Sequence, residues 1–276
     1  MSVTGKAVVL ARGLGTRMQD ESGGSELDED KARVAARGLK ALMPLNGRPF
    51  LDYAVDRLLG AGARQICLVV APEAEELRRA ARRIGEAAGI PVVCAVQAEP
   101  LGTADAVLAA EEFIGNDEFT MVNGDNLFPV AALERVARAA DDGCVLGAFA
   151  REELVAAGNI APERVRGFAV VQCDEDGQLV DIVEKPERPE DYARGGRVLV
   201  SMNLYRFKPG ILDFCRDVEP DTRRGELELT AAVGAMARSG RTPFRVVLCR
   251  GPVYDLTRRQ DVPTLERALK GQKLCF

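Results

Sequence analysis

The chain has 276 residues, of which 47% are hydrophobic and 29% are charged, and its formal net charge is −5. A chain of this length can bury a sizeable apolar core, and its mildly acidic balance argues against a general nucleic-acid partner, which needs a basic surface. The sequence has no histidine, which excludes Ser-His-Asp and Cys-His catalysis and also zinc sites with histidine ligands.

The apolar runs and the cysteines predict a cytoplasmic protein without a membrane partner. No apolar run approaches the roughly 20 residues that a membrane-spanning helix needs. Residues 1–6 show no signal-peptide pattern and lead directly into a strand-like run. None of the seven cysteines forms a CxxC pair, so we expect free thiols in a reducing compartment.

Strand-like and helix-like runs alternate through residues 1–150. The predicted strands are Lys6–Leu10, Gln65–Val70, Pro91–Gln97, Phe119–Asn123 and Cys144–Ala150. The predicted helices are 49–60, Glu73–Ala88, Gly102–Glu112 and Val130–Ala140. Such alternation is typical of βαβ units, so we expect an α/β fold with a Rossmann-like, mostly parallel central sheet flanked by helices.

In the second half of the chain, the predicted strands and helices no longer alternate regularly. Two predicted strands, Phe168–Cys173 and Gln178–Val183, flank the turn sequence Asp174–Gly177, which predicts a β-hairpin. A strand at Val198–Phe207, helices near 209–217 and 227–239, a strand at 243–249 and a helix near 260–270 follow. Because no Pro/Ser-rich linker or internal repeat divides the chain, we expect a single domain, 1–276, with an α+β lobe built onto the first sheet.

The segment Gln19–Arg37 is polar, contains Gly23-Gly24 and includes the acidic run Glu26–Asp30. We predict a mobile loop here, with a short helix through Lys31–Ala36. A loop of this length in a compact domain is usually functional or disordered.

The first candidate site is the glycine-rich sequence Leu10–Met18, LARGLGTRM, which follows the first predicted strand. Gly13 and Gly15 allow a sharp turn that brings backbone N–H groups close to an anion, and Arg17 adds a fixed positive charge. Glycine spacing alone fits an ordinary strand-to-helix turn equally well. The sequence matches neither a dinucleotide fingerprint, because Met18 stands where a third glycine is needed, nor a P-loop.

Further charged residues lie beside apolar segments. Lys40 precedes a proline-braced segment and could project into a pocket, although a solvated surface lysine is the commoner case. Asp125 and Asp255 follow predicted strands, where a carboxylate suits Mg²⁺, a hard cation that prefers oxygen ligands; the alternative is a turn or helix-cap role. Glu184 and Lys185 end another strand and suit hydroxyl and phosphate groups, or else form a surface ion pair worth little.

In order and spacing, these segments resemble the sugar nucleotidyltransferase family, which includes glucose-1-phosphate thymidylyltransferase, mannose-1-phosphate guanylyltransferase and ADP-glucose pyrophosphorylase. The resemblance extends from Lys6 to about Asp261. The matching elements are LAxGxGTR[LM] at Leu10–Met18, Lys-x-x-x-Pro-[LI] at Lys40–Leu45, Gln-x4-Gly-Thr-Ala at Gln97–Ala104, Gly124-Asp125, Glu184–Pro186 and a strand-end aspartate, Asp255. Six elements in order are far more specific than any one of them.

The resemblance implies a role for each matching position. Residues 1–150 would form mainly the nucleotide-binding lobe, and residues 151–276 mainly the acceptor-binding lobe and the C-terminal helix. The implied catalytic residues are Arg17, Lys40 and Lys185. The nucleotide would contact Leu10, Ala11, Arg12, Gly13, Leu14, Gly15, Thr16, Arg17, Gln97, Gly102 and Thr103, with Gln97 and Gly102 at the base. The acceptor would contact Asn123, Gly124, Gly167, Glu184, Lys185 and Asn203, and Asp125 and Asp255 would hold Mg²⁺ as the cofactor.

The implied activity is transfer of a nucleotidyl group from a nucleoside triphosphate to a sugar 1-phosphate, with release of pyrophosphate. These two small molecules would be the partners, and the resemblance is also compatible with a homo-oligomer. Two alternatives stay open: transfer to a non-sugar acceptor, such as phosphocholine, another phosphorylated alcohol or a phosphonate, and a non-catalytic regulatory relative that binds nucleotide. The motifs do not identify the base.

The sequence departs from the family pattern at four places. Arg12 stands where the family usually has Ala or Gly, and it reaches either the phosphates or solvent. Asn203 replaces a usual Gly near the sugar, which predicts an unusual acceptor. Tyr254–Thr257 replaces a more typical Trp-x-Asp-x-Gly pattern around the second metal ligand. Segment 19–37 is longer than the family version, and we expect it to close over the substrates.

Overall fold

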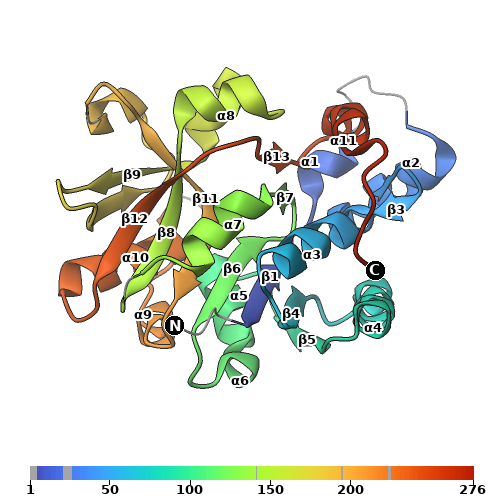
Figure 1. Cartoon of the computed structure of the whole chain (residues 1–276), viewed down its shortest axis with the longest axis horizontal. Coiled ribbons are helices and arrows are strands. Elements are labelled where there is room, and N and C mark those ends of the chain that lie inside the picture. The colour runs from blue at the N-terminus through green and yellow to red at the C-terminus, as the bar shows by residue number, and fades with distance from the viewer. Residues whose placement is uncertain (1–4, 21–26, 141, 194, 223–224) are drawn as a thin grey trace.

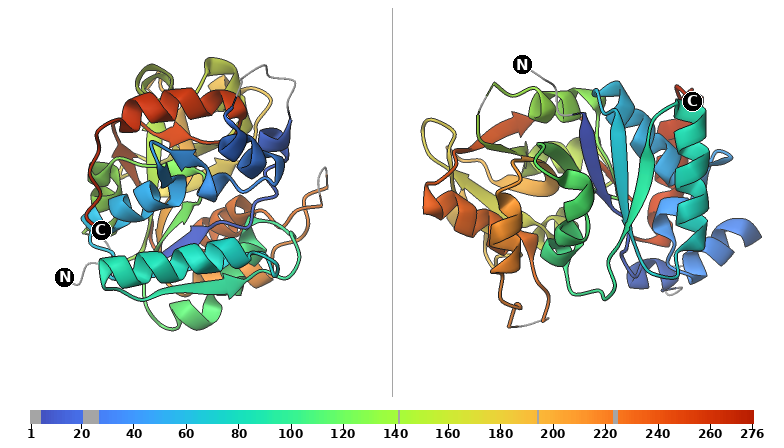
Figure 2. Two further views of the ribbon diagram at one scale, coloured as in Figure 1. Left: turned by 90° about the vertical axis from the view of Figure 1, so that its right-hand side faces the viewer. Right: turned by 90° about the horizontal axis from the view of Figure 1, so that it is seen from below.

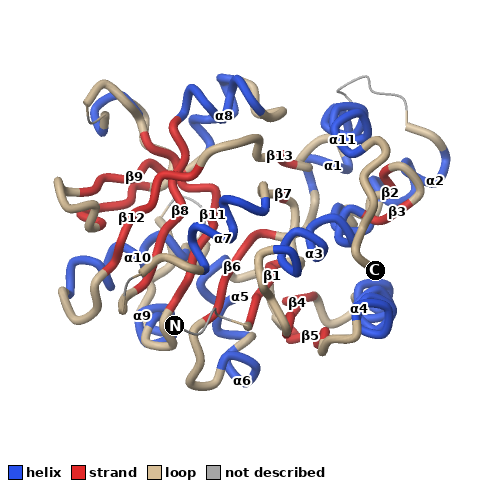
Figure 3. Tube along the Cα trace, viewed as in Figure 1, coloured by secondary structure: helices blue, strands red, loops and turns tan. Residues whose placement is uncertain are grey.

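The computed structural model describes residues 5–20, 27–140, 142–193, 195–222 and 225–276. Within these residues, nine strands form one central sheet (Figure 3). The strands are β1 (Lys6–Leu10), β4 (Gln65–Val70), β5 (Val92–Val96), β6 (Phe119–Asn123), β8 (Cys144–Ala150), β9 (Ala169–Cys173), β10 (Leu179–Val183), β11 (Leu199–Phe207) and β12 (Phe244–Cys249). Their order is β10-β9-β11-β6-β1-β4-β5, and β8 pairs with both β11 and β12.

Strand direction confirms the predicted α/β class. β1 is parallel to β4 and β6, and β4 is parallel to β5. β11 is antiparallel to β6, β8 and β9, so these three strands share one direction, and β12 shares it because it is parallel to β8. β10 and β11 therefore run against an otherwise parallel sheet, and β9 and β10 form the predicted hairpin. Both reversed strands come from the second half of the chain.

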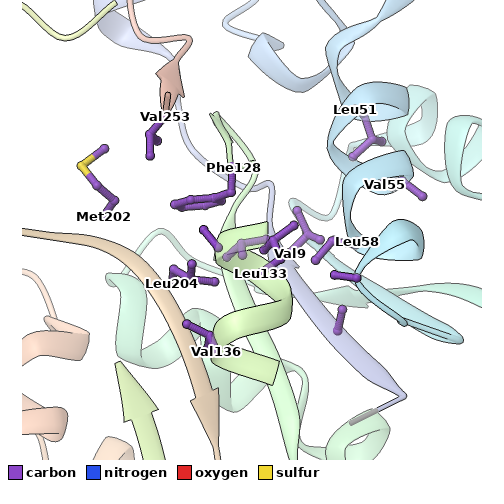
Figure 4. Packing of buried hydrophobic residues seen from close by; sticks show 14 of the residues in the cluster. Val9, Leu51, Val55, Leu58, Phe128, Leu133, Val136, Met202, Leu204 and Val253 are labelled. Carbon is purple, nitrogen blue, oxygen red and sulfur yellow. The ribbon is translucent and has the colours of Figure 1, made fainter. Parts of the chain in front are cut away.

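Helices cover both faces of the sheet (Figure 2). One face carries α3 (Phe50–Gly60), α4 (Glu75–Ala88), α7 (Val130–Ala137) and α8 (Arg151–Ala157), and the other carries α5 (Thr103–Ala109), α6 (Glu111–Ile114), α9 (Ile211–Arg216) and α10 (Leu229–Ser239). Alternate residues of a strand face opposite sides, so Val9 joins the first core and Val8 the second. Figure 4 shows Val9 between Leu58 of α3 and Leu133 of α7.

A third core joins the two ends of the chain. It contains Met18 of α1 (Thr16–Gln19), Ala35 of α2 (Glu29–Ala36), Phe50 of α3 and Leu265 of α11 (Val262–Leu269). Figure 1 shows α11 beside α1 and α2. The last helix thus packs against the segment that follows β1, rather than against the second-half strands that precede it in sequence.

The predicted loop 19–37 contains a longer helix than expected. α2 begins at Glu29 instead of Lys31, because the side chain of Asp28 caps it by accepting from the Lys31 backbone N–H at 2.9 Å. Residues 21–26, the middle of the predicted mobile loop, lie outside the described residues.

Other differences are confined to short elements and helix ends. The helix predicted at Val130–Ala140 ends at Ala137. Beyond its end, the Arg206 guanidinium donates to the carbonyl of Ala139 at 2.7 Å. The helix predicted at Gly102–Glu112 is divided into α5 and α6 around Ala110. The sequence pattern did not predict α8. It also did not predict two short strand pairs, β2 (Pro44–Leu45) with β3 (Arg48–Pro49) and β7 (Asn126–Leu127) with β13 (Tyr254–Asp255). The same holds for the 3-10 turns η1 (Lys40–Leu42), η2 (Pro162–Gly167), η3 (Pro189–Tyr192) and η4 (Arg259–Asp261). Among the described helices, none has both the length and the apolar character needed to cross a membrane.

Candidate active site

The glycine-rich loop leaves the sheet at the carboxyl end of β1, between its parallel neighbours β4 and β6. The Ala11 backbone N–H donates to the Val69 carbonyl, and the Gly124 N–H donates to the Leu10 carbonyl at 2.8 Å. A Cβ on Gly124 would lie 2.8 Å from that same Leu10 oxygen. The close approach therefore requires glycine and sets the ends of β1 and β6 side by side.

Two glycines fix the far end of the loop. Gly15 has φ 64°, and a Cβ there would lie 2.3 Å from the Gly38 carbonyl oxygen. Gly38 has φ 67°, and a Cβ there would lie 2.2 Å from the Leu14 carbonyl oxygen. Main chain thus packs directly on main chain across two segments. Gly38 was not predicted as a site residue; its position just after a helix is the usual signal for a left-handed glycine.

Gly13 differs from these glycines. A Cβ at this position would meet no protein atom within 4 Å, and its φ is not in the left-handed region. Packing within the chain therefore does not require glycine at residue 13. The open space beside Gly13 belongs to the cleft that the loop lines.

A cleft of about 380 Å³ lies in front of the loop. It brings together most of the residues predicted from the sequence: Leu10, Ala11, Arg12, Gly13, Leu14, Gly15, Thr16, Arg17, Lys40, Gln97, Gly102, Thr103, Asn123, Gly124 and Asp125. The lining residues that sequence reasoning missed are Gly38, Leu39, Ala41, Leu77, Pro100, Ala106 and Glu226. Among these lining residues, Leu14 has a largely exposed side chain, at 60%.

An ion pair forms one wall of the cleft. Lys40, the first residue of η1, places its Nζ 2.8 Å from Oδ2 of Asp125, which follows β6. The two side chains are 14% and 28% exposed, so the pair is largely shielded from water yet borders the cleft. A cation and a carboxylate in this position can bind an anionic ligand and a metal cation respectively.

Asp255 lies next to Asp125 because β13 pairs with β7. Asp255 is opposite Asn126, and the Leu256 N–H donates to the Asp125 carbonyl at 2.8 Å. Burial raises the pKa of Asp255 to about 6, and the nearby Asp125 charge adds to the rise, whereas Arg164 opposes it. The Asp255 carboxylate accepts from the Arg164 guanidinium and from Asn126 Nδ2, the latter at 3.2 Å. Sequence reasoning did not find Arg164.

Arg12 lines the cleft and also binds two backbone carbonyls. Its Nε donates to the Gln97 carbonyl at 3.0 Å, and its Nη2 donates to the Ala98 carbonyl at 3.2 Å. Arg12 thus ties the glycine-rich loop to the segment after β5. The Gln97 side chain is oriented in turn, because its Nε2 donates to the Gly102 carbonyl and to the Asp105 carboxylate, both of which can only accept.

The predicted acceptor residues of the second half do not line the cleft. Gly167 is exposed at the end of η2, and Glu184 and Lys185 follow β10, where they form an ion pair at 3.2 Å. Lys185 has φ 44° and Asn203 has φ 58°. Asn203 lies in a bulge of β11, two residues before Tyr205, which pairs with Met121 of β6. The bulge therefore comes near the end of β6, where Asn123 borders the cleft.

The Asn203 conformation accounts for the replacement of glycine at this position. Its backbone is left-handed, and asparagine is the residue that tolerates this region best after glycine. The Asn203 N–H donates to Oγ of Ser201 at 3.3 Å, and that hydroxyl lies 3.2 Å from the Tyr205 hydroxyl. The bulge is therefore held by a local polar network.

Comparison with known proteins agrees with the fold and the motifs. The family model described as nucleotidyl transferase matches residues 32–248. UTP–glucose-1-phosphate uridylyltransferase AglF of Haloferax volcanii is 32% identical over 237 residues, which cover 86% of this chain and 85% of that protein. Two other curated relatives match 85% of this chain, but the chain spans 58% of their length.

Two solved structures share the fold over nearly the whole chain. UDP-glucose pyrophosphorylase complexed with UDP-glucose has a TM-score of 0.73 at 19% identity, covering 97% of this chain and 99% of that one. The inositol-1-phosphate CTP transferase from T. maritima has a TM-score of 0.73 at 17% identity, covering 99% of each chain. The match over residues 32–248, the similarity to AglF and the shared fold lead to one conclusion: the chain belongs to the nucleotidyl transferase family.

Proposed function

We propose that this chain transfers a nucleotidyl group from a nucleoside triphosphate to a sugar 1-phosphate and releases pyrophosphate. An oxygen of the acceptor phosphate attacks the α-phosphorus, and a new P–O bond forms in line with the bond that breaks. Pyrophosphate leaves with the electron pair of the broken bond. Because the second pKa of a phosphate monoester is about 6, the attacking oxygen is mostly ionised near pH 7 and needs no general base. A chain without histidine is therefore suited to this reaction.

The observation that carries the proposal is the Lys40–Asp125 ion pair on the wall of the glycine-rich cleft. A triphosphate bound along residues 10–17 would contact both groups, since all of them line the same space. Lys40 would neutralise charge on the phosphates during transfer, and Arg17 would hold them in line. Alignment and charge neutralisation are the two contributions that this reaction requires of a protein.

The carboxylates fit a magnesium ion. Asp125 and Asp255 are neighbours, and the raised pKa of Asp255 reflects burial and the negative charge of Asp125 beside it. No group of three or more acidic, cysteine or histidine residues suited to a metal occurs in the described part of the chain. Two carboxylates suffice for Mg²⁺, which usually completes its shell with water and substrate phosphates. When bound, Mg²⁺ would supply Lewis-acid stabilisation of the phosphate charge.

A sugar 1-phosphate is the acceptor that we favour, because AglF is named for glucose 1-phosphate and the UDP-glucose pyrophosphorylase structure contains UDP-glucose. Gly167, Glu184, Lys185 and Asn203 are our candidates for contacting it. The second candidate is a phosphorylated alcohol, since the inositol-1-phosphate CTP transferase matches this fold with the same TM-score. Asn203 in place of the usual glycine is the feature of this chain that supports the second candidate.

We also propose that the protein acts in the cytoplasm. The seven cysteines, all among the described residues, form no disulfide, and burial raises the pKa of Cys67, Cys215 and Cys249 to about 12. Such thiols stay protonated at neutral pH and behave as small apolar side chains, as expected in a reducing compartment.

The proposal is tested by measuring pyrophosphate release with Mg²⁺, using five nucleoside triphosphates against a panel of acceptors. The panel contains glucose 1-phosphate, mannose 1-phosphate, inositol 1-phosphate and phosphocholine. We expect release with at least one sugar 1-phosphate and a clear preference for one base. Release with phosphocholine or inositol 1-phosphate alone would replace the sugar assignment by the second candidate, and no release with any pair would favour a non-catalytic nucleotide binder.

The Asp125→Asn variant tests the metal assignment within this reaction. Its amide keeps the shape of the carboxylate but loses the charge, so we expect kcat to fall about 100-fold or more at saturating substrates. Titration with Mg²⁺ should show weaker activation than in the unchanged enzyme. Full activity at ordinary Mg²⁺ concentration would show that Asp125 does not hold the cation.

A further inference from the structure

The helix that carries Arg17 has little support of its own. α1 has four residues, Thr16–Gln19, and the backbone N–H groups of Met18 and Gln19 both donate to the Gly15 carbonyl. A helix of this length leaves the carbonyls of its last turn without partners inside the helix. The direction in which Arg17 points therefore depends on what holds the two ends of α1. Gly38 holds the first end, through its contacts with Leu14 and Gly15.

A buried arginine from the far end of the chain holds the second end. Arg259 Nε donates to the Met18 carbonyl at 3.1 Å, and its Nη2 donates to the Gln19 carbonyl at 3.4 Å. Arg259 is 8% exposed, and Met18 is fully buried in the third core. A guanidinium at a helix C-terminus satisfies its carbonyls and also interacts favourably with the helix dipole.

Arg259 is itself anchored, because it is the first residue of η4 and η4 is fixed by Asp261. The Asp261 carboxylate accepts from the backbone N–H groups of Thr257 and Arg258, at 2.9 and 2.7 Å. It also accepts from Arg164 Nη1 at 2.6 Å and from Asn159 Nδ2 at 3.0 Å. Arg164 also forms an ion pair with Asp255, which lies beside Asp125, and Asp125 is on the wall of the cleft. Asp255, Arg164 and Asp261 thus form a polar network that fixes the backbone from which the Arg259 side chain reaches α1.

We propose that Arg259 is a positioning residue for nucleotide binding: it fixes α1 so that Arg17 points into the cleft. Arg17 lines the cleft, whereas Arg259 does not, so Arg259 acts through the main chain of α1 and touches no substrate. Loss of its hydrogen bonds leaves α1 free to fray at its second end. Triphosphate binding then weakens, while the acceptor residues after β10 and in β11 keep their contacts. The kinetic part rests on the proposed function, but the effect on α1 does not.

The chain offers a matched control in Arg206. This residue is 4% exposed and also donates to backbone carbonyls, those of Ala139 and Gly143, at 2.7 and 3.3 Å. It pairs with Thr120 near the start of β6, whereas the cleft lies at the other end of that strand. Arg259→Met and Arg206→Met therefore remove the same kind of buried contact at two different places.

Two readouts test the proposal. Hydrogen–deuterium exchange of the peptide covering residues 10–20 reports α1 directly, since its amides are bonded within the turn. We expect faster exchange there in Arg259→Met than in Arg206→Met, with partial recovery in Arg259→Lys, which keeps the charge and one donor. In pyrophosphate release, kcat/KM for the triphosphate should fall about 10- to 100-fold in Arg259→Met, mainly through KM, while KM for the acceptor stays unchanged.

The outcomes separate this proposal from the proposed function. Unchanged exchange of residues 10–20 in both Arg259 variants would overturn the positioning role, and so would equal acceleration in Arg206→Met. If Arg259→Met fails to fold, Arg259→Lys decides by the same exchange and kinetic measurements. If the unchanged protein releases no pyrophosphate with any substrate pair, the proposed function fails, and the exchange experiment alone decides whether Arg259 holds α1.

Discussion

The glycine-rich cleft and the residues that we propose for the acceptor are held in different ways. Around the cleft, backbone packs on backbone, at Gly15 with Gly38 and at Gly124 with Leu10. On the acceptor side, Lys185 and Asn203 occupy left-handed conformations that non-glycine residues seldom adopt. Such conformations often occur at ligand clamps, where the surrounding structure maintains them. The difference suggests that the first region is shaped by main chain and the second by individual side chains.

This contrast has consequences for substitution. A change in the backbone contacts around the cleft should lower the free energy of unfolding and weaken the binding of both substrates together. A change in one side chain proposed to contact the acceptor should leave folding intact and alter the KM for one substrate.

The largest effect is expected for Lys40→Met, because in our proposal Lys40 is the cation that neutralises charge on the phosphates during transfer. We expect kcat to fall about 100- to 1,000-fold, measured as pyrophosphate release. Lys6→Met is the matched control: Lys6 Nζ is also 2.8 Å from a carboxylate, that of Asp117, and its side chain is 17% exposed. Lys6 lies at the start of β1, away from the cleft. Equal losses in the two variants would point to a general stability effect instead.

Gly15→Ala should mainly affect folding. The left-handed backbone and the 2.3 Å approach to the Gly38 oxygen both oppose a Cβ. We expect a loss of about 2–5 kcal/mol in the free energy of unfolding, measured by urea denaturation. Gly13→Ala, which meets no protein atom within 4 Å, should stay within about 0.5 kcal/mol of the unchanged protein while raising KM for the triphosphate. Similar stability losses at both positions would contradict the main-chain account of the loop.

The smallest effect is expected for Lys185→Met. The side chain is 41% exposed, so the free energy of unfolding should hardly change. Loss of a charged contact to the acceptor phosphate should raise KM for the acceptor about 10- to 100-fold, corresponding to roughly 1.5–3 kcal/mol. KM for the triphosphate should not change. Lys208→Met, which breaks an ion pair with Glu118 away from the cleft, is the control; an unaltered acceptor KM in Lys185→Met would remove Lys185 from the site.

Local signals in the sequence predicted the strands of the sheet, whereas the family resemblance predicted most of the residues that line the cleft. β1, β4, β6 and β8 have the predicted bounds, because continuous apolar runs bounded by turn residues are typical of buried strands. The glycine-rich loop follows directly from β1. Elements of two residues, such as β7 and β13, are too short to show a hydrophobic periodicity in the sequence, so their pairing was not predicted.

The residues that sequence reasoning missed act between distant segments. Gly38 packs on Leu14, Arg164 binds Asp255, and Arg259 binds the end of α1. None of these contacts has a local signature, because each depends on how the fold brings the segments together. Arg12 illustrates the same limit: its charge suggested phosphate or solvent, whereas its partners are the carbonyls of Gln97 and Ala98.

The most direct test of the central claim follows the oxygen that forms the new bond. A sugar 1-phosphate labelled with ¹⁸O on its phosphate is incubated with the preferred nucleoside triphosphate and Mg²⁺. The masses of the products are then measured by mass spectrometry. The account predicts a nucleotide sugar that carries the label, including the bridging oxygen, and an equal amount of unlabelled pyrophosphate. Pyrophosphate or nucleoside monophosphate formed without a labelled nucleotide sugar would contradict nucleotidyl transfer to the sugar phosphate.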